Sequence, residues 1–105
     1  MLAWVETEVA GIVGAFVEDG GDRVHLIAMW VAREARRRGV GRTLVDAVVG
    51  WAAEIGAPAV RLDVGDDNVA ARRLYERAGF AATGRTRRYE NRPRLTTVEL
   101  ERPVQ

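Results

Sequence analysis

The spacing of apolar residues changes along the chain, and each spacing predicts an element of secondary structure. Leu2 to Val5 and Val9 to Val17 are rich in β-forming residues on either side of a polar break, which predicts two antiparallel strands. Asp19 to Asp22 contains the glycines of a hairpin turn. Arg23 to Val31 is nearly all apolar after its first residues, which predicts a third strand covered on both faces.

A helical spacing follows the glycine-containing segment that ends near Gly41. Gly56 and Pro58 are the stop signals of that helix. The short apolar run Ala59 to Val64 then predicts a strand parallel to the third one, with a right-handed crossover between them. The apolar residues that recur every three or four positions, as in a helix packed on a sheet, are Val40, Leu44, Val48, Ala52 and Ile55.

The last third of the chain predicts another helix and a hairpin. Asp66 to Asn68 offers N-cap residues for a helix over roughly Val69 to Ala78, which a glycine ends. Phe80 to Arg88 and Leu95 to Glu101 predict antiparallel strands around the Tyr89 to Pro93 loop. The predicted fold class is α/β with a mixed, mostly antiparallel sheet, in a single domain that comprises the whole chain.

The amino-acid composition limits the catalytic groups that the chain can use. At 105 residues the chain can bury about two-thirds of the surface that it exposes when unfolded. All 16 basic residues are arginine, so no lysine is available as a Schiff-base nucleophile. The absence of cysteine excludes disulfides and thiol catalysis, and we expect no metal site. With a net charge of +1, no signal peptide and no long apolar run, we expect a cytoplasmic protein.

The segment Arg36 to Arg42 has the features of an anion-binding site. The first turn of a helix has unpaired N–H groups and the positive end of the helix dipole, and Gly39 and Gly41 let an anion approach the backbone. The segment is not a Walker A loop, because one residue separates its glycines and no lysine follows. Leu44 occupies the position of the third small residue of a Rossmann fingerprint, so dinucleotide binding is disfavoured.

Two motifs resemble those of one family. The spacing Arg-x-x-Gly-x-Gly, formed by Arg36, Gly39 and Gly41, resembles the first signature of the GCN5-related N-acetyltransferases (GNAT). The segment Leu62 to Phe80 resembles the second, in which an Asn, an Ala, Leu-Tyr-Glu and Gly-Phe follow in order. The resemblance covers roughly Val9 to Leu100. It implies an acyl-CoA N-acyltransferase fold in which a central pair of parallel strands splays apart.

The resemblance also implies where acetyl-CoA binds. The pantetheine arm would lie between the strands Val24 to Val31 and Ala59 to Val64, and backbone amides from Arg37 to Arg42 would hold the pyrophosphate. A main-chain N–H near Trp30 or Val31 would polarise the thioester carbonyl. The cofactor-binding residues implied in this way are Trp30, Val31, Arg36, Arg37, Arg38, Gly39, Val40, Gly41, Arg42, Thr43, Asn68, Ala71 and Arg73.

Acetyl transfer to an amine needs an acid for the departing thiolate and a base for the amine. A phenol with a reference pKa of about 10 stays protonated at neutral pH, and the family assigns the tyrosine matching Tyr75 to the thiolate. Asp63 stands where ribosomal-protein N-terminal acetyltransferases, which this segment resembles, have a glutamate that acts as base through water. A hydrogen bond from a neighbouring loop to Asp63 is the alternative. His25 has a suitable pKa, although a lone histidine near a strand start is more often structural.

Three functions stay open at this point. The first is direct transfer of an acetyl group from acetyl-CoA to a primary amine of a small molecule or a peptide N-terminus. The second is a non-catalytic CoA-binding domain, because we expect a short form that lacks the family's usual N-terminal strand and two helices. The third, less favoured, is an arginine-rich module for RNA or phosphate. An exposed edge at Leu2 to Val5 would favour a homodimer, and no membrane partner is expected.

Overall fold

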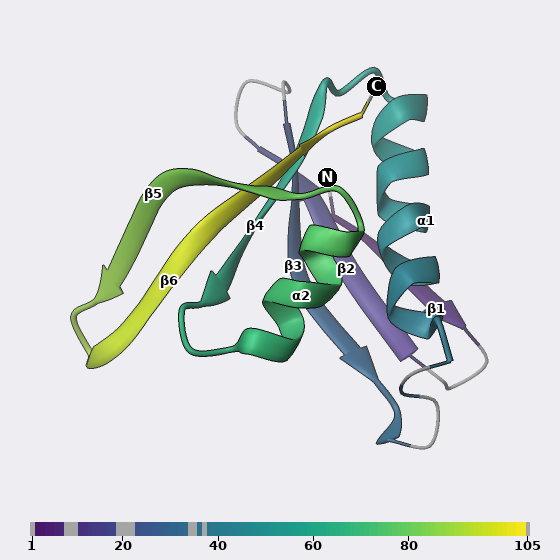
Figure 1. The fold of residues 1–105 in the computed structure, drawn as a ribbon. Helices are drawn as coiled ribbons and strands as arrows, with labels where there is room; N and C mark the ends of the chain where they lie inside the picture. The colour runs from purple at the N-terminus through teal and green to yellow at the C-terminus, as the bar shows by residue number, and fades with distance from the viewer. Residues whose placement is uncertain (1, 8–10, 19–22, 34–35, 37, 105) are drawn as a thin grey trace.

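A computed structural model of the chain describes residues 2–7, 11–18, 23–33, 36 and 38–104. The predicted hairpin turn at residues 19–22 and Arg37 of the predicted pyrophosphate site lie outside the described residues. Figure 1 shows the elements, which follow one another as β1 (Leu2–Thr7), β2 (Gly11–Val17), β3 (Arg23–Val31), α1 (Val40–Glu54), β4 (Ala59–Gly65), α2 (Val69–Arg77), β5 (Ala81–Tyr89) and β6 (Arg92–Pro103).

The strands form a six-stranded sheet in the order β1-β2-β3-β4-β6-β5. Only β3 and β4 pair in parallel, and the other neighbours are antiparallel. This topology confirms the predicted class, a mixed and mostly antiparallel sheet with one central parallel pair. β1 forms one edge of the sheet, as predicted for its first residues.

The hydrophobic core lies between the sheet and the helices, which stand in front of the sheet in the view of Figure 1. The buried side chains of α1 recur with the helical period that the sequence predicts. Along the strands, every second residue points into the same core. Core side chains include Val13, Val24, Leu26, Leu44, Val45, Val48, Val60, Leu62 and Leu100, each at most 4% exposed.

One extra residue interrupts the pairing of β3 with β2. Gly14 pairs with Ala28, whereas the next residue of β2, Ala15, pairs with Leu26. Ile27 therefore has no partner on β2 and forms a β-bulge. A bulge of this kind bends its strand and increases the local twist.

The bulge coincides with the separation of β3 from β4. Before it, Val24 and Leu26 point into the core; after it, Met29 and Val31 pack against the core, so the alternation has shifted by one residue. The parallel pairing ends at Leu26 and Leu62, directly before the bulge. Figure 1 shows the two strands diverging from this point, with α2 beside the gap.

Two details of the sequence-based prediction are wrong. β3 is not covered on both faces, because Ile27 is 43% and Trp30 52% exposed. The loop of the last hairpin is shorter than predicted, because β5 extends to Tyr89 and β6 begins at Arg92. Within the described part of the chain, neither helix is long and apolar enough to cross a membrane.

Candidate functional site

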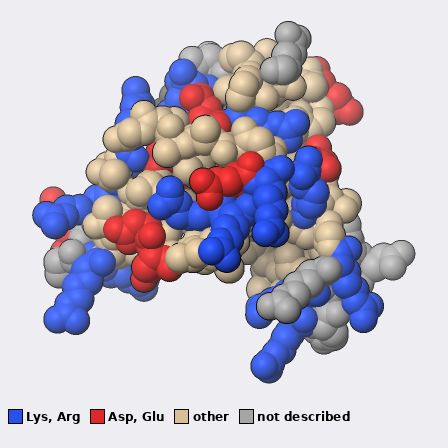
Figure 2. All heavy atoms as spheres, viewed as in Figure 1, with Lys and Arg blue, Asp and Glu red and all other residues tan. Residues whose placement is uncertain are grey.

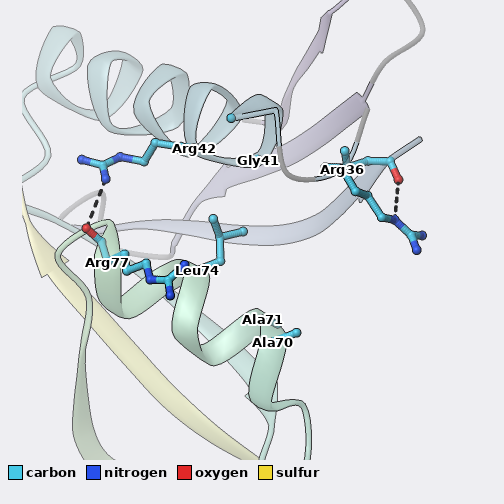
Figure 3. A pocket seen from close by; sticks show the side chains of 9 residues that line it. Arg36, Gly41, Arg42, Ala70, Ala71, Leu74 and Arg77 are labelled. Carbon is cyan, nitrogen blue, oxygen red and sulfur yellow. Dashed lines mark hydrogen bonds between the residues drawn. The ribbon is translucent and has the colours of Figure 1, made fainter. Parts of the chain in front are cut away.

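A cleft of about 660 Å³ lies where β3 and β4 have separated. One wall comes from the end of β3, the following loop and the start of α1, with Val31, Arg36, Gly39, Gly41 and Arg42. The other wall comes from α2, with Ala70, Ala71, Leu74 and Arg77. Figure 3 shows these two walls facing each other across the cleft.

The N-terminus of α1 forms the polar end of this cleft. Its N-cap, Gly39, has a φ of +81°, a conformation that favours glycine, and no described side chain caps the helix. The Gly39 carbonyl accepts hydrogen bonds from the N–H and the hydroxyl of Thr43, both at 3.0 Å. The N–H groups of Val40, Gly41 and Arg42 have no partner within the helix, and the first turn has no acidic residue. Unpaired donors and the helix dipole make this end attractive to an anion.

Gly41 sets the distance between the two helices. A Cβ atom at this position would lie 3.1 Å from Cδ2 of Leu74, which is closer than ordinary van der Waals contact. Glycine therefore lets the start of α1 approach α2. The two walls of the cleft depend on this close approach, so Gly41 has a structural role besides exposing backbone donors.

Two of the three arginine side chains that line the cleft, Arg36 and Arg42, form hydrogen bonds within the protein. Nη1 of Arg42 donates to the Arg77 carbonyl at 3.1 Å, and its Nε donates to Asp46 at 3.2 Å. Nε of Arg36 donates to the Val31 carbonyl at 3.3 Å. Figure 3 shows that the Arg42 bond joins α1 to the end of α2. These bonds hold both cations at the rim of the cleft.

α2 presents a different face to the cleft than the sequence suggested. Asn68 caps the helix, since its Oδ1 accepts from the Ala71 N–H at 3.2 Å. Ala71 lines the cleft as predicted, whereas Ala70, Leu74 and Arg77 were missed. Ala70, Leu74 and Arg77 are spaced four and then three residues apart, so they lie on one face of the helix, next to Ala71.

Tyr75 lies in the core rather than among the lining residues of the cleft. It is 7% exposed, and its ring meets Phe80 edge-on at a centroid distance of 5.8 Å. Burial raises the pKa of the Tyr75 phenol, so the hydroxyl stays protonated well above neutral pH. Arg73 is exposed and also lies outside the lining. The proposed roles of both residues stay predictions.

Asp63 and His25 come together on the sheet. Asp63 is the first residue of β4 beyond its last pair with β3. Its Oδ2 lies 3.9 Å from Nε2 of His25, and Nδ1 of His25 lies 3.2 Å from Oε1 of Glu18. The imidazole thus stands between two carboxylates, and its ring is 5.2 Å from that of Phe16. Among the described residues, no group of three or more acidic or histidine side chains could hold a metal ion.

Comparison with known proteins agrees with this geometry. The sequence model described as "Acetyltransferase (GNAT) family" matches residues 1–80. N-acetyltransferase 8 of Homo sapiens is 36% identical over 90 residues, which are 79% of this chain and 40% of that protein. The crystal structure of nourseothricin acetyltransferase is 28% identical and matches with a TM-score of 0.84, over 91% of this chain and 58% of that one.

A third comparison concerns the fold alone. The structure of an aminoglycoside 6'-N-acetyltransferase complexed with coenzyme A matches with a TM-score of 0.77 at 18% identity, over 91% of this chain and 67% of that one. Taken with the family match, the splayed strands and the open helix terminus, this fold places the chain in a known class. The chain belongs to the acetyltransferase (GNAT) family. It spans about two fifths of the length of the human relative.

Proposed function

We propose that the chain is an acetyl-CoA-dependent N-acetyltransferase that transfers the acetyl group directly to a primary amine. The observation that supports this most is the open N-terminus of α1, which meets a cleft at the separation of β3 and β4. Backbone N–H groups from Val40 to Arg42 fit the pyrophosphate of CoA, because they have no partner among the described residues and are positively polarised. The apolar wall formed by Ala71 and Leu74 fits the pantetheine arm.

The reaction requires two proton movements around one acyl transfer. The amine nitrogen, after losing a proton, forms a bond to the acetyl carbon, the carbon–sulfur bond breaks, and the sulfur leaves as a thiolate that takes up a proton. We assign that last proton to Tyr75, whose raised pKa keeps it protonated. We assign the proton from the amine to Asp63, which lies at the separation of the strands.

The test uses acetyl-CoA binding and turnover as separate measurements. We expect acetyl-CoA to raise the melting temperature, because a ligand that binds only the native state stabilises it. We expect CoA thiol release with some amine, and a loss of roughly 100-fold or more in kcat for Tyr75→Phe, typical of a lost general acid. Tyr89→Phe, which removes the other phenol, is the matched control. No stabilisation by acetyl-CoA would disprove the proposal.

A non-catalytic CoA-binding domain is the second candidate, and the position of Tyr75 favours it. Tyr75 is nearly buried and lies outside the lining of the cleft, whereas an acid must reach the sulfur. This candidate predicts stabilisation by CoA without turnover of any amine in a broad panel. Turnover that falls in Tyr75→Phe would exclude it.

An RNA-binding module is less well supported. In Figure 2, acidic side chains lie between the basic ones over much of the visible face, and basic side chains gather at the two lower tips. Mixed charges of this kind weaken the attraction to a polyanion. Binding of RNA that falls steeply with salt, and persists in Tyr75→Phe, would revive this candidate.

We also propose that the β1 edge pairs with a second copy of the chain. β1 ends the sheet, and an unpaired edge offers backbone donors and acceptors to another strand. Light scattering after size-exclusion chromatography would show a dimer mass. A monomer at all concentrations would contradict this proposal and leave the acetyltransferase proposal intact.

A further inference from the structure

A second, smaller cavity lies on the face of the sheet opposite the helices. It has a volume of about 210 Å³, and its lining includes His25, Arg61, Asp63, Arg85, Arg87 and Glu99. The alternation of the strands accounts for this set, since Leu62, Val64 and Leu100 point into the core and their neighbours point away from it. Asp63 lines one end of this cavity and is the first residue of β4 beyond its pairing with β3, so this end lies where the two strands separate.

We propose that this cavity binds the amine acceptor, and that the acceptor carries a carboxylate near its amino group, as an amino acid does. This inference rests on the proposed acetyl transfer and names the substrate class for it. The amino group would lie at Asp63, and the carboxylate would lie at Arg85 and Arg87. The argument depends on how charges are distributed within the cavity.

The charged groups at the centre of the cavity pair with one another. Arg61 is 8% exposed and lies 3.4 Å from Glu18, 3.5 Å from Glu99 and 3.8 Å from Glu101. Glu101 in turn pairs with Arg23 at 3.0 Å. Three carboxylates thus face two guanidinium groups, so the centre carries one net negative charge and does not attract an anion. A ligand carboxylate must therefore be matched at an end of the cavity.

One buried donor at the centre lacks a well-placed acceptor. Nε of Arg61 is buried and has no hydrogen-bond acceptor with suitable geometry among the described residues, although Oε1 of Glu18 lies 3.4 Å away. Buried polar groups are nearly always hydrogen-bonded, so this donor shows that the carboxylates around Arg61 do not fully satisfy its guanidinium group.

The β5 end of the cavity is positive. Arg85 and Arg87 are exposed, and within the described part of the chain neither lies within 4.0 Å of a carboxylate. Arg87 lies across from Thr97, on the same face as Glu99. A register shift in β5, where the residues between Ala82 and Thr86 oppose Glu99, sets the position of Arg85. Two unpaired guanidinium groups are suited to a carboxylate.

The opposite end of the cavity is negative. Asp63 is 22% exposed at its side chain, and its Oδ2 lies 3.9 Å from Nε2 of the His25 imidazole. Glu18 lies on the other side of that imidazole, at 3.2 Å. An ammonium group at Asp63 would gain an ion pair, and its proton would have a nearby carboxylate as acceptor. The two ends together match a zwitterion.

The size and the charges of the cavity favour a small zwitterion over other acceptors. A volume of about 210 Å³ is below the roughly 300–1,000 Å³ that holds drug-sized ligands, so the acceptor is small. A polycationic amine would be repelled by Arg85 and Arg87. A simple anion would leave Asp63 without a partner. An amino acid satisfies both ends at once.

The experiment is an NMR titration of the 105-residue chain, labelled with ¹⁵N, with three matched probes. L-Alanine carries both charges, L-alaninamide lacks the carboxylate, and propionate lacks the amino group. We expect saturable shifts of amides around Asp63 and Arg87 with alanine at concentrations up to roughly 50 mM, which detects weak complexes. We expect each of the other two probes to bind at least roughly tenfold more weakly.

Two variants connect the probes to the side chains. In the double variant Arg85→Gln and Arg87→Gln, alanine and alaninamide should bind equally, because the group that distinguishes them is lost. Arg88→Gln, on the same strand but outside the lining, is the control and should preserve the difference. The folding of each variant is checked by its ¹⁵N spectrum.

The outcomes separate this inference from the proposed function. Equal binding of alanine and alaninamide to the wild type, shifts with inorganic phosphate that match those of alanine, or no saturable shift with any probe would overturn the inference. None of these results depends on acetyl-CoA. Stabilisation by acetyl-CoA, measured separately, would still support the acetyltransferase, whereas its absence would count against the proposed function and leave only the binding of a zwitterion at this cavity.

Discussion

The N-termini of the two helices flank the same cleft, but they differ in whether a side chain accepts hydrogen bonds from their first backbone N–H groups. α2 is capped by its own side chain, because Asn68 accepts from the Ala71 N–H at 3.2 Å. α1 begins at Gly39, which has no side chain, and its first-turn donors stay open. A helix that must be stable by itself satisfies its donors internally. A helix that binds an anion leaves them to the ligand.

The largest expected effect comes from closing the open terminus. In Gly41→Asp the new carboxylate would repel the phosphates of CoA, and its Cβ would press on Leu74. We expect the affinity for acetyl-CoA to fall roughly 100-fold, corresponding to the loss of one or two charge-assisted hydrogen bonds. Isothermal titration calorimetry measures this loss.

The control for that variant lies on the same helix. Gly50→Asp introduces the same side chain at an exposed position, where an added Cβ would have nothing within 4 Å. Its affinity for acetyl-CoA should equal that of the wild type. If both variants bound equally well, the terminus of α1 would not be the pyrophosphate site.

Removing the cap of α2 should affect stability instead of binding. Asn68→Ala leaves the Ala71 N–H without its acceptor, which should lower the free energy of unfolding by about 1 kcal/mol. Asn68→Asp retains the acceptor and should retain the stability. Urea denaturation measures both. A loss of acetyl-CoA affinity with unchanged stability would instead assign the Asn68 side chain to the ligand.

A smaller effect should follow from cutting the connection between the helices. Arg42→Gln removes the bonds to the Arg77 carbonyl and to Asp46, both at the surface. Exposed interactions of this kind contribute roughly 0–1 kcal/mol, so the melting temperature should change little. The affinity for acetyl-CoA should fall only several-fold, because the backbone donors remain. A loss as large as that of Gly41→Asp would show that side-chain charge dominates.

The smallest effect at neutral pH concerns Tyr75, the buried side chain of α2. Because burial raises the folded-state pKa of Tyr75 above its unfolded value, its contribution to stability is fully present below about pH 10 and is lost as the pH rises further. Thermal unfolding between about pH 8 and pH 11 should show this decline. Tyr75→Phe should flatten it, because the group whose pKa is raised is then absent.

The open terminus of α1 was predictable from sequence because it depends on local signals. Two glycines at the start of an apolar helical pattern indicate that no side chain caps the first backbone N–H groups. Gly39 has the positive φ that such a turn requires. The cap at Asn68 is equally local. These features involve only neighbours in the chain, so one sequence suffices to predict them.

Features that depend on tertiary packing were not predictable in the same way. The helix face with Leu74 and Arg77 became visible only when the position of α2 beside α1 was known. The charged cavity joins His25 on β3 to Arg87 on β5, and no local pattern connects these strands. The apolar run of β3 concealed its bulge, because a shift in alternation cannot be seen where nearly every residue is apolar.

The bulge at Ile27 means that the gap between β3 and β4 depends on chain length as well as on side chains. Substituting Ile27 would leave the extra backbone unit in place, whereas deleting it would return Met29 and Val31 to the alternation of Val24 and Leu26. A chain shortened by one residue here could continue its pairing along a closed sheet. The width of the gap is therefore set by the number of backbone units in β3, which no substitution of a side chain can change.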